Sequence, residues 1–198
     1  MAFVNMSEVQ KEKVTRLLES GVAHSTELLG LMSKTQWGIM TSSVNEIPVV
    51  RLLSWFQREK SPCIGARLRA RADVPLEFLI LFNESSAKAV AEAVTKPIED
   101  KIRSLPDWVA VSIGEISNVL AQGVIGALAD ALDTMIILSV PEVQKGARSR
   151  ILSEALEAYD GRQDLLVTSQ VNMYSENLAA ECSMIIIVNA DCLRRMLN

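Results

Sequence analysis

The sequence predicts an α+β domain, three-layer-like in character, with two long helices on one face of a six-stranded sheet. Three observations support this prediction: two long helical patterns, short apolar strand-like runs between them, and an order of elements that occurs twice. Helical and strand periods that alternate along a chain of 198 residues indicate layers of helix and sheet. Because Ser-, Gly- or Pro-rich linkers are absent, we expect one compact domain over residues 1–198.

The helices are predicted from apolar residues that recur every three or four positions. The first spans residues 7–33, and Ser7 forms a capping box with Gln10 at its start. The second long helix runs from about Asp107 to Asp133. Shorter helical segments are expected at residues 83–94, 98–104, 147–159 and 189–198. Residues 51–59 fit either a short helix or an irregular connection.

The strands are predicted where apolar and β-branched residues alternate or run together between turn residues. These segments are residues 37–47, 63–73, 76–82, 133–140, 165–174 and 180–188. Val74 and Pro75 mark a turn between the second and third strands. Arg67, Arg69 and Arg71 share one face of their strand, which we interpret as solvated, with an acidic partner surface as the alternative.

The two halves of the chain, about 7–96 and 97–198, have the same order of elements, which we interpret as an internal repeat. Shifts of 93 and 106 residues align three pairs: Gly21 with Gly114, Pro48 with Pro141, and Asn83 with Asn189. We interpret the difference of 13 residues as an insertion that the helix at 147–159 fills. Two such copies would form one sheet about a pseudo-two-fold axis.

Composition excludes several classes of function. A net charge of −4 and a pI of about 5.2 argue against a broad nucleic-acid footprint. The only histidine, His24, cannot build a His-based metal cluster or a Ser-His triad within one chain, and we expect no metal site. The three cysteines form no CxxC pair, which is typical of free thiols in a reducing compartment.

The N-terminal residues lack the apolar core of a signal peptide. No apolar run approaches the roughly 20 residues that span a bilayer. We therefore expect a cytoplasmic protein that does not insert into a membrane.

Glu115 and Asn118 are the leading candidates for a functional site. They are three residues apart on the second long helix, so their side chains lie next to each other, and Gln122 and Gly126 fall within about 80° of them. A carboxylate and an amide can hold a water molecule or a phosphoryl oxygen, but they provide no nucleophile of their own. The alternative is an ordinary solvated helix face. Gly126 indicates close approach either by another molecule or by a neighbouring element of this chain.

The spacing of Glu115, Asn118 and Pro141, with 22 residues between the last two, resembles the signature of the CheC/CheX/FliY family of chemotaxis phosphatases. The segments EISNVLAQGVIGALADAL and LEFLILFNESSAKAVAEAV are also similar to that family. The resemblance implies hydrolysis of the aspartyl-phosphate of a CheY-like response regulator. It implies that Asn118 orients the attacking water and that Glu115 pairs with the regulator's active-site lysine. The regulator supplies Mg²⁺, so no cofactor of the chain's own is expected.

Two departures from the family pattern affect the expected site. Val111 stands where the family often has Ser or Asp, followed by Ser112, and we expect both to contact the partner together with Gln122 and Gly126. Val22 and Ser25 stand where the first repeat would carry its own Glu and Asn, which predicts a degenerate first site and one active site per chain.

Two alternatives to the phosphatase stay open. The first is a non-catalytic module that binds a response regulator, like the flagellar-switch relatives, which lack the Glu–Asn pair. The second is an adaptor that binds the receptor deamidase CheD, a role compatible with phosphatase activity. The retained pair favours catalysis.

Overall fold

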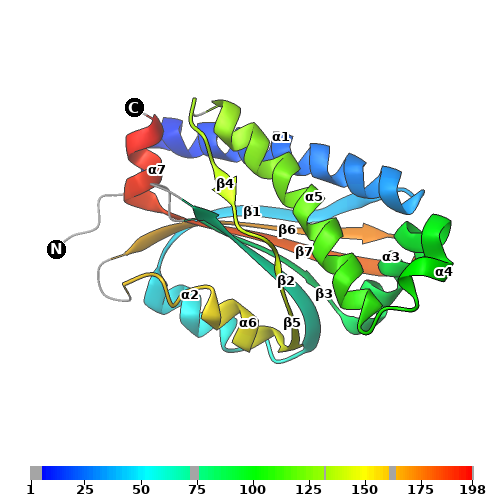
Figure 1. Cartoon of the computed structure of the whole chain (residues 1–198). Coiled ribbons are helices and arrows are strands. Elements are labelled where there is room, and N and C mark those ends of the chain that lie inside the picture. Colours follow the sequence, from blue (N-terminus) through cyan, green and yellow to red (C-terminus); the bar gives the residue numbers. More distant parts are fainter. Residues whose placement is uncertain (1–5, 72–75, 132, 161–163, 198) are drawn as a thin grey trace.

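The computed structural model describes residues 6–71, 76–131, 133–160 and 164–197. An antiparallel sheet separates two helical layers, which confirms the predicted α+β class (Figure 1). The long helices α1 (Glu8–Ser33) and α5 (Trp108–Ala131) lie together on one face of this sheet. The shorter helices α2 (Val49–Phe56) and α6 (Arg148–Glu154) cover part of the other face.

Helix ends follow the capping chemistry of the sequence. The backbone N–H of Gln10 donates to Ser7 Oγ, and the N–H of Ser7 donates to Gln10 Oε1, which is the expected capping box. Asn83 caps α3 (Glu84–Thr95), because its side-chain oxygen accepts a 2.7 Å hydrogen bond from the Ser86 N–H. The remaining helical segments are a 3₁₀ turn (Lys96–Ile98), α4 (Glu99–Ile102) and α7 (Ala190–Leu197). The segment with two interpretations, residues 51–59, is mainly the helix α2.

The sheet has seven strands within the described residues, in the order β1-β6-β7-β3-β2-β4, and β5 also pairs with β2. Their bounds are β1 (Gly38–Pro48), β2 (Pro62–Arg71), β3 (Leu76–Phe82), β4 (Ile137–Leu138), β5 (Glu142–Ala147), β6 (Leu165–Ser175) and β7 (Ala180–Asn189). The central β3 is buried throughout, as its apolar sequence predicts. The turn predicted at Val74 and Pro75 lies outside the described residues.

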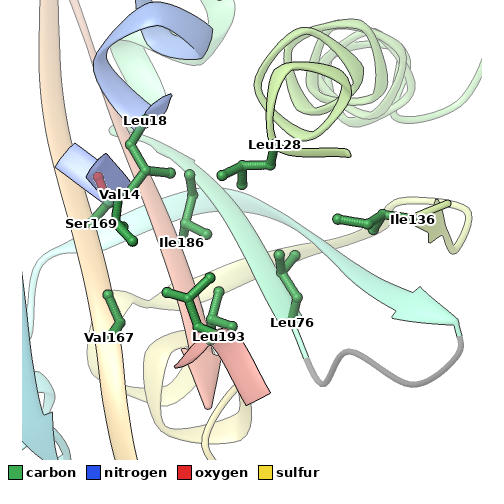
Figure 2. Close-up of a pocket in the computed structure, with 10 residues that line it drawn as sticks. Val14, Leu18, Leu76, Leu128, Ile136, Val167, Ser169, Ile186 and Leu193 are labelled. Atoms are coloured by element: carbon green, nitrogen blue, oxygen red, sulfur yellow. The ribbon is translucent and has the colours of Figure 1, made fainter. Parts of the chain in front are cut away.

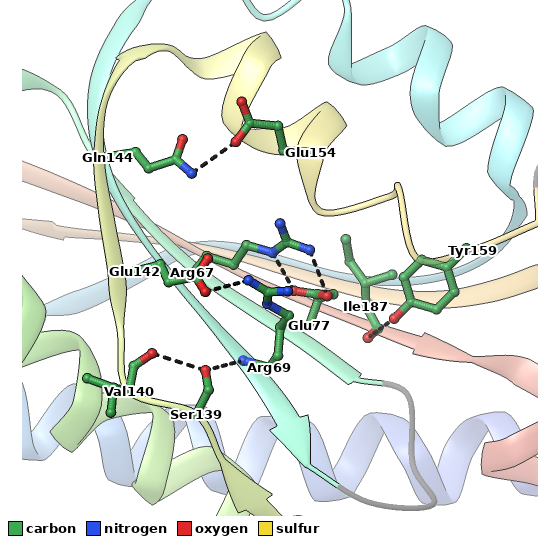
Figure 3. A network of polar contacts seen from close by, with 10 residues as sticks. All are labelled: Arg67, Arg69, Glu77, Ser139, Val140, Glu142, Gln144, Glu154, Tyr159 and Ile187. Atoms are coloured by element: carbon green, nitrogen blue, oxygen red, sulfur yellow. Dashed lines mark hydrogen bonds and ion pairs between the residues drawn. The ribbon is translucent and has the colours of Figure 1, made fainter.

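The predicted strand at 133–140 is wrong in its extent, because only Ile137–Leu138 pair there and the strand β5 follows. The interruption has a local cause. The backbone N–H of Arg69 donates to Ser139 Oγ rather than to a backbone carbonyl, and Pro141 has no N–H to donate (Figure 3). β4 and β5 therefore both pair with β2, along the edge that does not pair with β3. The sheet has seven strands among the described residues, where six were expected.

The order of the strands is symmetric about the central β3–β7 pair, since β2 and β6 flank it and β4–β5 and β1 lie at the edges. However, the expected offsets are wrong in part. β1 and β5 end 99 residues apart, at Pro48 and Ala147, and α2 and α6 begin directly after them. The helix α6 therefore corresponds to α2 and fills no insertion, and Pro141 is not the counterpart of Pro48. An origin of the two halves by duplication stays a prediction.

The long helices cross at very short distance. A Cβ added to Gly21 would lie 2.9 Å from the Cα of Val124, and Ser25 Oγ donates a 2.8 Å hydrogen bond to the carbonyl of Leu120. The 99-residue offset aligns Gly21 with position 120 and Ser25 with position 124. The contact of Gly21 with Val124 and that of Ser25 with Leu120 are therefore reciprocal. The crossing therefore lies near the pseudo-two-fold axis, and no larger residue fits at Gly21 without a shift of α5.

The face of β2 that carries Arg67 and Arg69 is solvated only in part, so the interpretation from the sequence is wrong for Arg67. Arg67 is 7% exposed and Glu77 is 3% exposed, and they form two hydrogen bonds of 2.7 and 2.9 Å (Figure 3). Burial raises the pKa of the Glu77 carboxyl, and the Arg67 guanidinium opposes that rise, while the ion pair raises the pKa of Arg67. Arg69 forms an exposed ion pair with Glu142.

Replacing Glu77 by Leu is expected to lower the free energy of unfolding by about 3–5 kcal/mol, because the Arg67 guanidinium then stays buried without its partner. Urea denaturation followed by circular dichroism measures this change. The double variant Arg67→Met with Glu77→Leu should recover most of the loss, because neither charge remains in the interior. A single variant as stable as the wild type would contradict the importance of this pair.

Candidate functional site

The helix α5 divides into a buried side and a free side. Its buried side packs on α1 and the sheet through these residues: Ile113, Ile116, Leu120, Ala121, Val124, Ile125 and Leu128. Its free side carries exposed Val111, Glu115 and Gln122, with Asn118 and Gly126 partly exposed between and beyond them. Figure 1 shows α5 at the outside of its layer, next to the edge formed by β4 and β5. The predicted row of polar and small residues is therefore open to another molecule.

Glu115 and Asn118 lie on this free side as predicted. Within the described residues, no side chain forms a hydrogen bond or ion pair with the Glu115 carboxylate. The Asn118 carboxamide has one contact of this kind, because Gln122 Nε2 donates to Asn118 Oδ1 at 3.4 Å. The carboxylate is thus available to a cation of another molecule, and the amide keeps both N–H donors and one oxygen lone pair.

Gly126 was interpreted as allowing close approach either by another molecule or by an element of this chain, and its surroundings distinguish the two. A Cβ added there would meet no atom within 4 Å, so no neighbouring element among the described residues uses the space. Close packing within the chain occurs at Gly21 instead, and at Gly123, where an added Cβ would lie 2.8 Å from Ser25 Oγ. The gap at Gly126 is therefore accessible from outside the molecule.

Ser112 does not reach the free side, which corrects its prediction as a partner-contacting residue. It is 4% exposed, and its hydroxyl donates to the carbonyl of Trp108 at 2.8 Å. The reason is the helical period, which turns Ser112 toward the core beside Ile113. Val111, one residue earlier, is 43% exposed, and its contact with a partner stays a prediction.

Val22 and Ser25 do not form a surface site, degenerate or otherwise. Both are buried at the crossing of α1 and α5, and the hydroxyl of Ser25 is used by Leu120. The 93-residue shift aligned Val22 with Glu115 and Ser25 with Asn118. The observed 99-residue offset instead aligns Arg16 and Glu19 with that pair. Both of these residues are exposed, and Arg16 forms a 2.6 Å ion pair with Glu12.

The strand β5, which the sequence analysis missed, supports the N-terminal half of α5. Val143 Cγ2 lies 3.1 Å from the position of a Cβ on Gly114, directly before Glu115. Lys145 Nζ forms a 2.8 Å ion pair with Asp107 at the start of α5 and lowers the pKa of that carboxyl. The alternating sequence EVQKGA was the available signal for this strand. The segment that follows Pro141 therefore holds the helix that carries the site.

The structure offers no alternative centre of metal or thiol chemistry in the part of the chain that it describes. No group of three or more His, Cys, Asp or Glu residues could hold a metal ion there. Cys63, Cys182 and Cys192 are free and buried, and burial raises the pKa of the Cys63 and Cys182 thiols. An apolar pocket between α1, α5 and the sheet is lined almost entirely by aliphatic side chains, with Ser169 the exception (Figure 2). This pocket offers no reactive group.

By length and composition, α5 could cross a membrane. This is weak evidence, because the core helix of a soluble protein passes the same test. Here its apolar side packs on α1 and the sheet, and its other side carries Glu115 and Gln122.

No protein-family model matches the chain. A protein of Halobacterium salinarum named "Putative CheY-P phosphatase CheC1" is 20% identical over 193 residues, which are 94% of each chain. The solved structure of Thermotoga maritima FliY matches with a TM-score of 0.71 and 11% identity, over 98% of this chain and 96% of that one. The resemblance to the CheC/CheX/FliY family is confirmed.

Further structures show the spread of this CheC-like fold. The FliM middle domain of H. pylori matches with a TM-score of 0.65 and 10% identity, over 97% of this chain and 98% of that one. CheX of Desulfovibrio desulfuricans matches with a TM-score of 0.54 and 11% identity, over 88% of this chain and 99% of that one. The fold is therefore shared by proteins named FliY, FliM and CheX, and the fold alone does not define the function of this chain.

Gly21 and Gly126 provide a matched test of the two sides of the long helices. Gly126→Ala should raise the free energy of unfolding by about 1 kcal/mol, because Ala is the better helix former and no atom opposes its Cβ. Gly21→Ala should lower it by about 1–3 kcal/mol, because the new methyl group meets the backbone of α5. Urea denaturation checks both. Equal effects of the two substitutions would contradict the assignment of Gly126 to an open surface.

Proposed function

We propose that this protein hydrolyses the aspartyl-phosphate of a CheY-like response regulator in chemotaxis signalling, with Glu115 and Asn118 as its catalytic residues. The observation that carries the proposal is the pair itself, which lies on the free side of α5, where Glu115 is exposed and Asn118 is partly exposed among the described residues. Likeness to a CheC1 along nearly the whole chain supports the same function.

The chemistry of the pair suits phosphoryl transfer, which depends on positioning and charge balance more than on covalent help. The Asn118 carboxamide orients the attacking water, because an amide is no base near neutral pH but can donate and accept hydrogen bonds. The Glu115 carboxylate pairs with a lysine of the regulator. Mg²⁺ belongs to the regulator in this scheme.

The open surface around the pair provides the docking site. Val111 and Gln122 extend the row on either side of Glu115 and Asn118, and the gap at Gly126 admits close approach of the regulator. A water molecule held beside the phosphoryl group in this contact is already oriented for attack, whereas a water molecule in free solution is not.

Asn118→Ala should lower the turnover of a phosphorylated regulator by about 100-fold, because a misplaced nucleophile costs a factor of that order. Glu115→Lys should also reduce it, because the new charge repels the lysine of the regulator. Single-turnover dephosphorylation with purified protein measures both, and circular dichroism confirms folding. Unchanged activity in both variants would overturn the assigned site.

Gly126→Leu tests the docking surface separately from the chemistry. A Cβ at this position meets no described atom within 4 Å, so we expect the fold to be retained. It should raise KM for the regulator about 10-fold through steric exclusion, within the roughly 1–3 kcal/mol typical of overpacking, and leave kcat nearly unchanged. Val9→Ala, at an exposed position on α1, is the control. A KM equal to that of the wild type would place the contact elsewhere.

The second candidate function is a non-catalytic module. The fold of the FliM middle domain, which has been crystallised with FliG, favours it. Binding of a phosphorylated regulator without turnover by the wild-type protein would select this function. Binding of CheD and a cytoplasmic location are compatible with either candidate and are checked by pull-down with purified CheD and by cell fractionation.

A further inference from the structure

We infer that Gln122 is a positioning residue, which fixes the orientation of the Asn118 carboxamide for the reaction. The inference rests on the proposed function and goes beyond a role for Gln122 in contacting the partner. Its basis is the hydrogen bond from Gln122 Nε2 to Asn118 Oδ1, which joins side chains one helical turn apart on the free side of α5.

An asparagine side chain has two faces of opposite chemistry, an oxygen that accepts and a nitrogen that donates. Rotation by 180° exchanges them with little change in shape. Only one of the two orientations presents the correct group to a water molecule. In the Glu115–Asn118 pair, no described side chain other than Gln122 selects between these orientations.

The donor of Gln122 makes that selection. It directs Asn118 Oδ1 toward Gln122 and along the helix, so the Nδ2 donors face away from it. The bond therefore favours one orientation of the amide in the free protein, and this preference strengthens when docking removes water from the contact.

The bond is long and exposed in the free protein, so its effect is moderate. A typical intramolecular hydrogen bond corresponds to about a 2- to 10-fold change in an equilibrium. We therefore expect Gln122→Met, which has similar volume and no donor, to lower kcat by about 2- to 10-fold with little change in KM. A role in binding alone would raise KM and leave kcat unchanged.

A series at position 122 separates orientation from charge. Gln122→Lys keeps a donor for Asn118 Oδ1 and should retain most of kcat, whereas Gln122→Glu offers only acceptors, favours the flipped amide and should lower kcat more than Gln122→Met. Val119→Lys and Val119→Glu place the same charges on the neighbouring exposed residue. If the Val119 variants reproduce the order of the Gln122 variants, the effect is general electrostatics and the inference is overturned.

A second measurement does not depend on turnover. The side-chain amide of Asn118, followed by ¹⁵N NMR in the free protein, should change its chemical shift and gain mobility in Gln122→Met, but not in Val119→Ala. If the wild type shows no phosphatase activity, the proposed function fails, and this spectrum still tests the hydrogen bond. If the wild type is active and neither kcat nor the Asn118 amide responds to Gln122→Met, only the positioning role fails.

Discussion

The close crossing of α1 and α5 is the constraint on which the rest of the structure depends. Gly21 lets the backbone of α5 approach to within van der Waals contact, and the hydroxyl of Ser25 bonds to the carbonyl of Leu120 at the same place. Because this contact fixes which side of α5 is buried, the helical period fixes which residues are free. Glu115 and Gln122 are exposed, and Asn118 is partly exposed, as a consequence of where Gly21 and Ser25 lie.

Support for the site also comes from the edge of the sheet. β5 pairs only with β2, and its side chains reach α5 through Val143 and Lys145. The buried Arg67–Glu77 pair holds β2 to β3 on the opposite face of the sheet. Through β2, the site helix is thus connected to the most deeply buried part of the protein. A side chain with the proposed role of orienting a single water molecule needs support of this kind.

The sequence predicted the fold class, both long helices and the free side of α5, because these follow from the strong 3.6-residue period and, for α1, from the capping box at Ser7. It failed around Pro141. There the hydroxyl of Ser139 replaces a backbone acceptor, and this substitution depends on tertiary pairing with Arg69. The error about Val22 and Ser25 has a different origin. Repeats aligned on prolines gave an offset of 93 residues, whereas the crossing of the helices and the β1 and β5 ends give 99.

The corrected offset explains why the pseudo-two-fold axis provides one candidate site rather than two. The positions of Glu115 and Asn118 are occupied in α1 by Arg16 and Glu19. The guanidinium of Arg16 already pairs with Glu12 within the same helix, and it would repel the lysine that Glu115 is proposed to meet. Glu19 places a negative charge where a phosphoryl group would approach, and an ionised carboxylate has no N–H to donate. The exposed faces of α1 and α5 therefore differ in charge and in hydrogen-bonding capacity at these aligned positions, and of the two the α5 face fits the proposed contact with a phosphorylated partner.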